Sequence, residues 1–237
     1  MRKINQLLTV GLLLLLVSCG ASEQELVKQG RALMFQEEYK SAIPKFDAAL
    51  EINPQNYTAL NAKGVALQRL DQLNASVEVL TNAISVDTTA YQAFFNRGNA
   101  YRLMGKDNEA MLDLDYAITL QPDVVDAYIN RGAILFKYGE FDRALLDFEL
   151  ALTIDPQSAL VYLNKGKTEL RTDNPTDALY DLKKAIEIDP QMAEAYYWLG
   201  LAELTNGNLT NGCQYLENAQ QLDYSPAAEA YASNCMQ

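Results

Sequence analysis

The chain has 237 residues, of which 49% are hydrophobic, with 12 Gly and 7 Pro, a composition typical of a folded protein rather than a disordered or fibrous one. Its formal net charge of -12 argues against nucleic acid as a partner, because phosphate contacts need a basic surface. There is no histidine, so the commonest general base and zinc ligand are missing. The composition therefore disfavours an enzyme and gives no reason to expect a cofactor or a metal.

The first predicted element is a secretory signal peptide over residues 1–18. Arg2 and Lys3 precede an apolar run from Leu7 to Val17. The charged start and short apolar middle are typical of a secretory signal, and the run is too short to cross a bilayer. An uncleaved anchor helix is the alternative interpretation.

The apolar run ends in LVSC at residues 16–19, which resembles the bacterial lipobox. The resemblance implies that Cys19 becomes the acylated N-terminus and that residues 19–22 form a short lipidated linker, with a reach of about 10 Å from the lipid to the next element. Residue 20 is Gly rather than Asp, which by analogy with envelope sorting favours the outer membrane. We therefore expect a lipid-anchored protein of the bacterial envelope, facing the periplasm or the exterior.

From residue 23 onward the chain repeats every 34 residues without insertion or deletion. Glycine recurs first on this period, at Gly30, Gly64, Gly98, Gly132, Gly166 and Gly200. Alanine recurs at Ala49, Ala83, Ala117, Ala151, Ala185 and Ala219, and small residues also recur at Ala42, Ser76, Ala110, Ala144, Ala178 and Gly212. Large apolar residues recur at Phe46, Leu80, Leu114, Phe148, Leu182 and Leu216. A fixed period of this length predicts a repeat architecture.

Within each unit the apolar spacing of three and four residues predicts two antiparallel helices with a turn such as that at Gly139 between them. Gly at position eight, Ala at twenty and twenty-seven and Pro at thirty-two resemble the tetratricopeptide repeat. The resemblance implies an all-α solenoid. Its six repeats span residues 23–56, 57–90, 91–124, 125–158, 159–192 and 193–226, followed by a C-terminal capping helix over 227–237.

Three central repeats carry a cation at position seven together with an aspartate at position twenty-three. Their joint occurrence predicts structural ion pairs, each contributing about 0.2 to 1 kcal/mol if it lies near the surface. A role of the two arginines in binding is the alternative. The predicted pairs are Arg97 with Asp113, Arg131 with Asp147 and Lys165 with Asp181.

The face of each first helix that points away from its partner lines the concave groove in this family. Positions two, five, six, nine, twelve and thirteen lie on that face, and we call them the groove positions. Amides and exposed apolar side chains there suit an extended peptide, so we predict a protein-binding groove. Its residues are Phe95, Asn96, Asn99, Arg102, Ile129, Asn130, Phe136, Leu163, Asn164, Tyr197 and Trp198. The alternative is that the Asn is a consensus habit and the apolar residues are half-buried against adjacent helices.

A clamp for a terminal carboxylate, as in chaperone-binding members of the family, is not expected. That clamp needs lysine and asparagine in one first helix, asparagine in the next, and lysine and arginine in the third. The corresponding residues are Phe95 with Asn99, then Asn130, then Leu160 with Asn164, so both asparagines match but every cation is missing.

The two remaining cysteines, Cys213 and Cys235, predict a disulfide that holds the capping helix over the last repeat. Two free buried thiols are the alternative.

Together these features predict a non-enzymatic, lipid-anchored adaptor that binds an envelope protein or peptide and helps assemble or regulate a membrane-associated complex. A pilus or secretin assembly lipoprotein, or a purely structural spacer, are the alternatives.

Overall fold

A computed structural model describes residues 21–236, which form a single series of α-helices. The described part of the chain contains thirteen helices and no strand, which confirms the prediction of six helical hairpins and a C-terminal helix. The helices are α1 (Glu23–Phe35), α2 (Tyr39–Ile52), α3 (Tyr57–Arg69), α4 (Leu73–Val86), α5 (Tyr91–Leu103), α6 (Asp107–Leu120), α7 (Val125–Lys137), α8 (Phe141–Ile154), α9 (Ala159–Arg171), α10 (Pro175–Ile188), α11 (Ala193–Thr205), α12 (Leu209–Gln221) and α13 (Pro226–Cys235).

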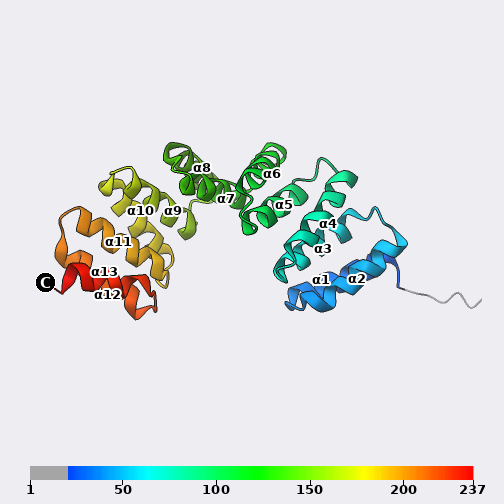
Figure 1. The fold of residues 1–237 in the computed structure, drawn as a ribbon, viewed down its shortest axis with the longest axis horizontal. Helices are drawn as coiled ribbons and strands as arrows, with labels where there is room; N and C mark the ends of the chain where they lie inside the picture. The colour runs from blue at the N-terminus through cyan, green and yellow to red at the C-terminus, as the bar shows by residue number, and fades with distance from the viewer. Residues whose placement is uncertain (1–20, 237) are drawn as a thin grey trace, which may run out of the picture.

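The hairpins stack in chain order into an arch (Figure 1). Each first helix packs against its own second helix and against the second helix of the preceding repeat. First helices also contact one another, as between α1 and α3 and between α9 and α11. In the middle of the arch α5, α7 and α9 lie on the inner side, while α6 and α8 lie on the outer side. The odd-numbered helices of the hairpins therefore form the concave wall.

The small residues of the repeat allow the paired helices to approach closely. Gly132 on α7 faces the ring of Phe148 on α8, and a Cβ added to Gly132 would lie only 2.7 Å from that ring. Phe148 is 1% exposed and packs with residues of repeats four and five. Burial between neighbouring units, rather than one central core, thus stabilises the array.

The turn inside each hairpin needs a left-handed residue at position fifteen. Gly105, Gly139 and Gly207 supply it with φ of 71°, 77° and 81°. The equivalent residues of the other repeats, Glu37, Asp71 and Asp173, adopt φ of 60°, 58° and 58°. The turn geometry is therefore kept even where the residue has a side chain, a conformation that Asp adopts more readily than most residues.

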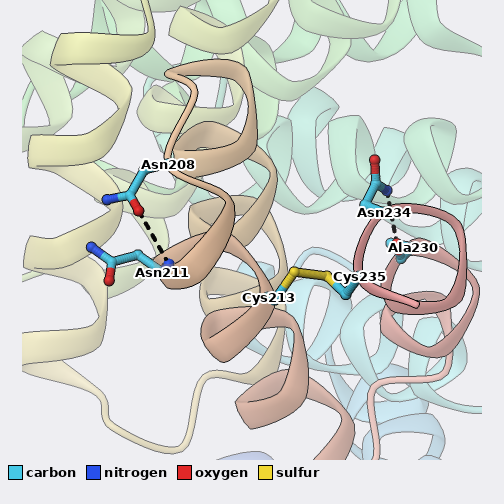
Figure 2. The surroundings of a disulfide bond; sticks show 6 residues. All are labelled: Asn208, Asn211, Cys213, Ala230, Asn234 and Cys235. Carbon is cyan, nitrogen blue, oxygen red and sulfur yellow. Dashed lines mark hydrogen bonds between the residues drawn. A yellow bond between two sulfur atoms is a disulfide. The ribbon is translucent and has the colours of Figure 1, made fainter. Parts of the chain in front are cut away.

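A disulfide joins the last hairpin to the final helix. Cys213 on α12 and Cys235 at the end of α13 are bonded, with their Cα atoms 5.7 Å apart (Figure 2). Ala227 of α13 is fully buried. The helix that covers the end of the array is thus held covalently as well as by packing.

Candidate protein-binding groove

Five of the predicted groove residues line one cavity of ≈ 630 Å³ on the concave wall. Phe95, Asn96, Asn99 and Arg102 come from α5, and Asn130 comes from α7. Helix α3 adds Val65, Gln68 and Arg69, which the sequence prediction did not include. These residues occupy groove positions nine, twelve and thirteen of repeat two, so the rule used for the later repeats would have found them. The cavity crosses three consecutive first helices, a course that an extended chain can follow.

The asparagines of the groove are hydrogen-bonded across the repeats. Asn96 Nδ2 donates to Asn61 Oδ1 at 2.9 Å, and Asn130 Nδ2 donates to Asn99 Oδ1 at 2.7 Å. These amides therefore tie successive first helices together, a structural role that the sequence did not reveal. The carbonyl oxygens of Asn96 and Asn130 accept no hydrogen bond from any other described residue, so each amide keeps an acceptor for a ligand.

Two of the apolar groove residues do not lie where the sequence prediction placed them. Ile129 is only 8% exposed and Leu163 only 2%, and both belong to core clusters. The reason is that α7 contacts α9 and α9 contacts α11, so the side chains of Ile129 and Leu163 are each covered by the next repeat. Their assignment as exposed ligand contacts was wrong, and the half-buried alternative describes these two residues better. Phe95 is partly exposed and does line the cavity.

The remaining predicted residues lie further along the concave wall. Phe136 and Asn164 line a second cavity of ≈ 230 Å³ together with Lys167. Tyr197 packs edge-on to Trp198, with ring centroids 5.5 Å apart. The Lys167 ammonium lies 5.5 Å from the centre of the Trp198 ring. These residues form a separate aromatic and cationic region, so the structure does not bring all eleven predicted residues into one site.

The three predicted ion pairs are present, with partly exposed cations and buried aspartates. Arg131 donates to both carboxylate oxygens of Asp147, at 2.9 and 2.6 Å, and Asp147 is only 3% exposed. The third donor of Arg131 reaches Asp115 of the preceding repeat at 2.6 Å. Hydrogen bonding to Asp147 raises the pKa of the Arg131 guanidinium above its ordinary value. The aspartate of the pair is therefore desolvated, and removing one partner of a buried pair costs about 3 to 5 kcal/mol because the other charge is left unpaired.

The other two pairs follow the same pattern. Arg97 holds Asp113 through two hydrogen bonds of 2.7 and 2.8 Å and also donates to Thr81 of the preceding repeat at 3.0 Å. Lys165 contacts Asp181 at 2.5 Å. The arginines at position seven thus link neighbouring repeats as well as the two helices of one hairpin.

A second carboxylate shares the lysine of repeat five. Lys165 Nζ donates to Glu169 Oε1 at 2.7 Å, and Glu169 and Asp181 are 5% and 2% exposed. Burial raises the pKa of Glu169 to about 7. Hydrogen bonding to Lys165 lowers this pKa, and the negative charge of Asp181 offsets part of that lowering. Glu169 Oε2 is buried without a hydrogen-bond partner. Glu169 occupies position eleven of its repeat, which faces the core. A charged residue at a core position could therefore have predicted this buried charge cluster from the sequence.

Residues 21–236 contain no cluster of His, Cys, Asp and Glu that could hold a metal ion. In the same range no helix has the length and apolar character needed to cross a membrane. Cys19 and the predicted signal lie outside the described residues.

Family models match most of the array. Models described as tetratricopeptide repeat match residues 27–81, 125–158 and 193–226, and one described as TPR repeat matches residues 98–139 and 176–207. No curated protein matches the chain.

Several solved structures share the fold. The structure of Pseudomonas aeruginosa pilF is 18% identical, has a TM-score of 0.79 and covers 89% of this chain and 95% of that one. PilW, a widely conserved type IV pilus biogenesis factor, is 20% identical with a TM-score of 0.77 and coverage of 89% and 97%. YrrB, described as a TPR protein with an unusual peptide-binding site, is 21% identical with a TM-score of 0.66 and coverage of 78% and 96%. Since the identities are low, these likenesses concern the fold. The unbroken period, the stacked hairpins and the family matches together show that this chain is a tetratricopeptide-repeat protein.

Proposed function

We propose that the protein is a lipid-anchored, non-enzymatic scaffold that binds an extended segment of another envelope protein in its concave groove and so helps to assemble or regulate a membrane-associated complex. The observation that carries the proposal is the ≈ 630 Å³ cavity, which is lined by amides, two arginines and part of Phe95 across three first helices. Amides of this kind pair with the backbone of an extended chain, while the apolar wall accepts its side chains.

The fold neighbours support this class of function. YrrB is described as having an unusual peptide-binding site, and PilW is described as a type IV pilus biogenesis factor. The lipid anchor rests on the lipobox resemblance at Cys19, and α1 begins at Glu23, only four residues later. A linker that short holds the first repeat at the membrane surface, with the groove extending away from it.

Photo-crosslinking tests the binding proposal. A photoreactive residue placed at position 96 or 130 should form an adduct with a partner in the native envelope. With the probe at position 96, combining Phe95→Ala with Asn130→Ala should abolish that capture, whereas Asn82→Ala with Leu112→Ala, on the second helices, should not. Thermal melting of both variants checks that the array remains folded. Identical adducts from the groove variant would contradict the proposal and favour a structural spacer.

Metabolic labelling with an alkyne analogue of palmitate tests the anchor separately. The wild type should carry the label, and Cys19→Ser should lose it. A wild type that stays in the membrane fraction without any label would favour the uncleaved anchor helix.

A role in pilus or secretin assembly is the narrower candidate, favoured by the coverage of almost the whole of pilF and PilW by this chain. Deletion of the gene should then reduce the amount of assembled secretin multimer or surface pili. Normal levels of both would reject this narrower role and leave the scaffold proposal standing.

A further inference from the structure

Charge is unevenly distributed between the groove and the rest of the molecule. The chain as a whole is strongly acidic, with 31 Asp and Glu against 19 Lys and Arg. At the groove positions of the six first helices, however, only Asp126 and Glu194 are acidic. The basic residues at these positions are Lys28, Arg31, Arg69, Arg102, Lys137, Lys167 and Arg171. The concave wall is therefore a basic strip inside an acidic protein.

Most of these groove cations have no anionic partner within the protein. Lys137 pairs with Asp107, and Lys167 pairs with Glu194 at 2.6 Å. Among the described residues the other groove cations form no ion pair. By contrast, Arg97, Arg131 and Lys165, inside the hairpins, are each held by a buried aspartate. Most of the cations without an ion pair in the described part of the chain thus lie on the face that a ligand would meet; Lys40, Lys45 and Lys106 are the others.

The cavity also contains donors that lack an acceptor. Only three buried side-chain polar atoms in residues 21–236 lack a hydrogen-bond partner, and two of them, Gln68 Nε2 and Arg102 Nε, are donors on residues that line this cavity. A buried donor left unpaired destabilises the folded protein, and more so when it is charged. Arg69 lines the same cavity without an ion pair. The site therefore lacks acceptor oxygens that a ligand would bring.

We propose that the groove recognises an extended polypeptide segment that carries acidic side chains, with a carboxylate bound by Arg102 and Gln68, assisted by Arg69. Arg and carboxylate groups form strong, directional hydrogen bonds, which matches the planar donor set of Arg102. Phe95 and Val65 on the same wall contact the apolar neighbours of that carboxylate in the ligand. Asp71 and Asp126, also on the wall, disfavour a continuous polyanion such as nucleic acid. This inference rests on the proposed function of the groove.

Selection from a random library of 12-residue peptides tests the proposal. The peptides are displayed on phage with their C-termini fused to the coat protein, so that every available carboxylate belongs to a side chain or to the coat. Peptides retained by the full folded array, and not by the Phe95→Ala/Asn130→Ala variant, should be enriched in Asp and Glu. Groove-dependent peptides with no acidic enrichment would overturn the acidic specificity and leave the scaffold proposal intact. If no peptide requires the groove, the scaffold proposal itself fails.

A selected peptide then allows a matched comparison. Arg102→Gln should weaken its binding on the order of tenfold, and Arg69→Gln should add to that loss. Lys40→Gln and Lys45→Gln remove unpaired cations of α2 outside the groove positions and should leave the affinity unchanged. Replacing the acidic residues of the peptide by Gln should weaken binding as much as Arg102→Gln does. Combining the altered peptide with Arg102→Gln should weaken binding little further. Independent, additive losses would show that Arg102 does not bind the carboxylate.

Discussion

Glu169→Gln should make the protein more stable at neutral and alkaline pH, while leaving its stability at low pH nearly unchanged. The folded state raises the pKa of Glu169 from 4.5 to about 7, mainly by burial. Below pH 4.5 the carboxyl is protonated in both the folded and the unfolded state, so it has no destabilising effect there. As the pH rises from about 4.5 to 7, the unfolded state loses its proton first, and the unfolding free energy falls. At 1.36 kcal/mol per pH unit, the loss reaches about 3 kcal/mol above pH 7.

Urea denaturation of the wild type and the variant between pH 4 and pH 9 measures this difference directly. The unfolding free energy of Glu169→Gln minus that of the wild type should be close to zero at pH 4 and rise to about 3 kcal/mol by pH 8. Taking the difference removes the contributions of the other carboxylates. Glu149→Gln, an exposed change on α8, controls for the loss of one negative charge from the protein. A variant that is less stable than the wild type at pH 8 would mean that Glu169 is ionised and favourably paired with Lys165, and would refute the reasoning.

Three further changes test the packing and the cross-links. Gly132→Ala should lower the unfolding free energy by about 1 to 3 kcal/mol in chemical denaturation, because its Cβ would meet the buried Phe148 ring at 2.7 Å. Gly98→Ala should have a smaller effect, because the atom nearest to its Cβ would be 3.3 Å away. Arg131→Asp or Asp147→Arg alone should destabilise the array by about 3 kcal/mol or more, and the double swap should cost less than their sum; an additive result in the double-mutant cycle would contradict the pair. Replacing Cys213 and Cys235 by Ser should lower the unfolding free energy by about 3 kcal/mol and speed hydrogen exchange in α13, and unchanged exchange would show that packing alone holds the helix.

The helices and the close contacts inside each hairpin could be predicted from the sequence, because the same small and large residues recur in every unit. The contacts between units could not, since they depend on how far one hairpin rotates against the next. That rotation buries Ile129 and Leu163 and brings Asn130 to Asn99, and no spacing within one repeat reports it. The turn residues show a similar limit: glycine marks three left-handed turns, but Glu37 occupies the same conformation without a recognisable residue type.

The bonded α13 helix also has a consequence for assembly. Each hairpin of the array packs against the next one along the chain. After the last hairpin, the bridge between Cys213 and Cys235 keeps α13 packed against α12. The chain therefore covers the stacking surface of its last hairpin with a helix of its own, and no second molecule is needed to shield it from water.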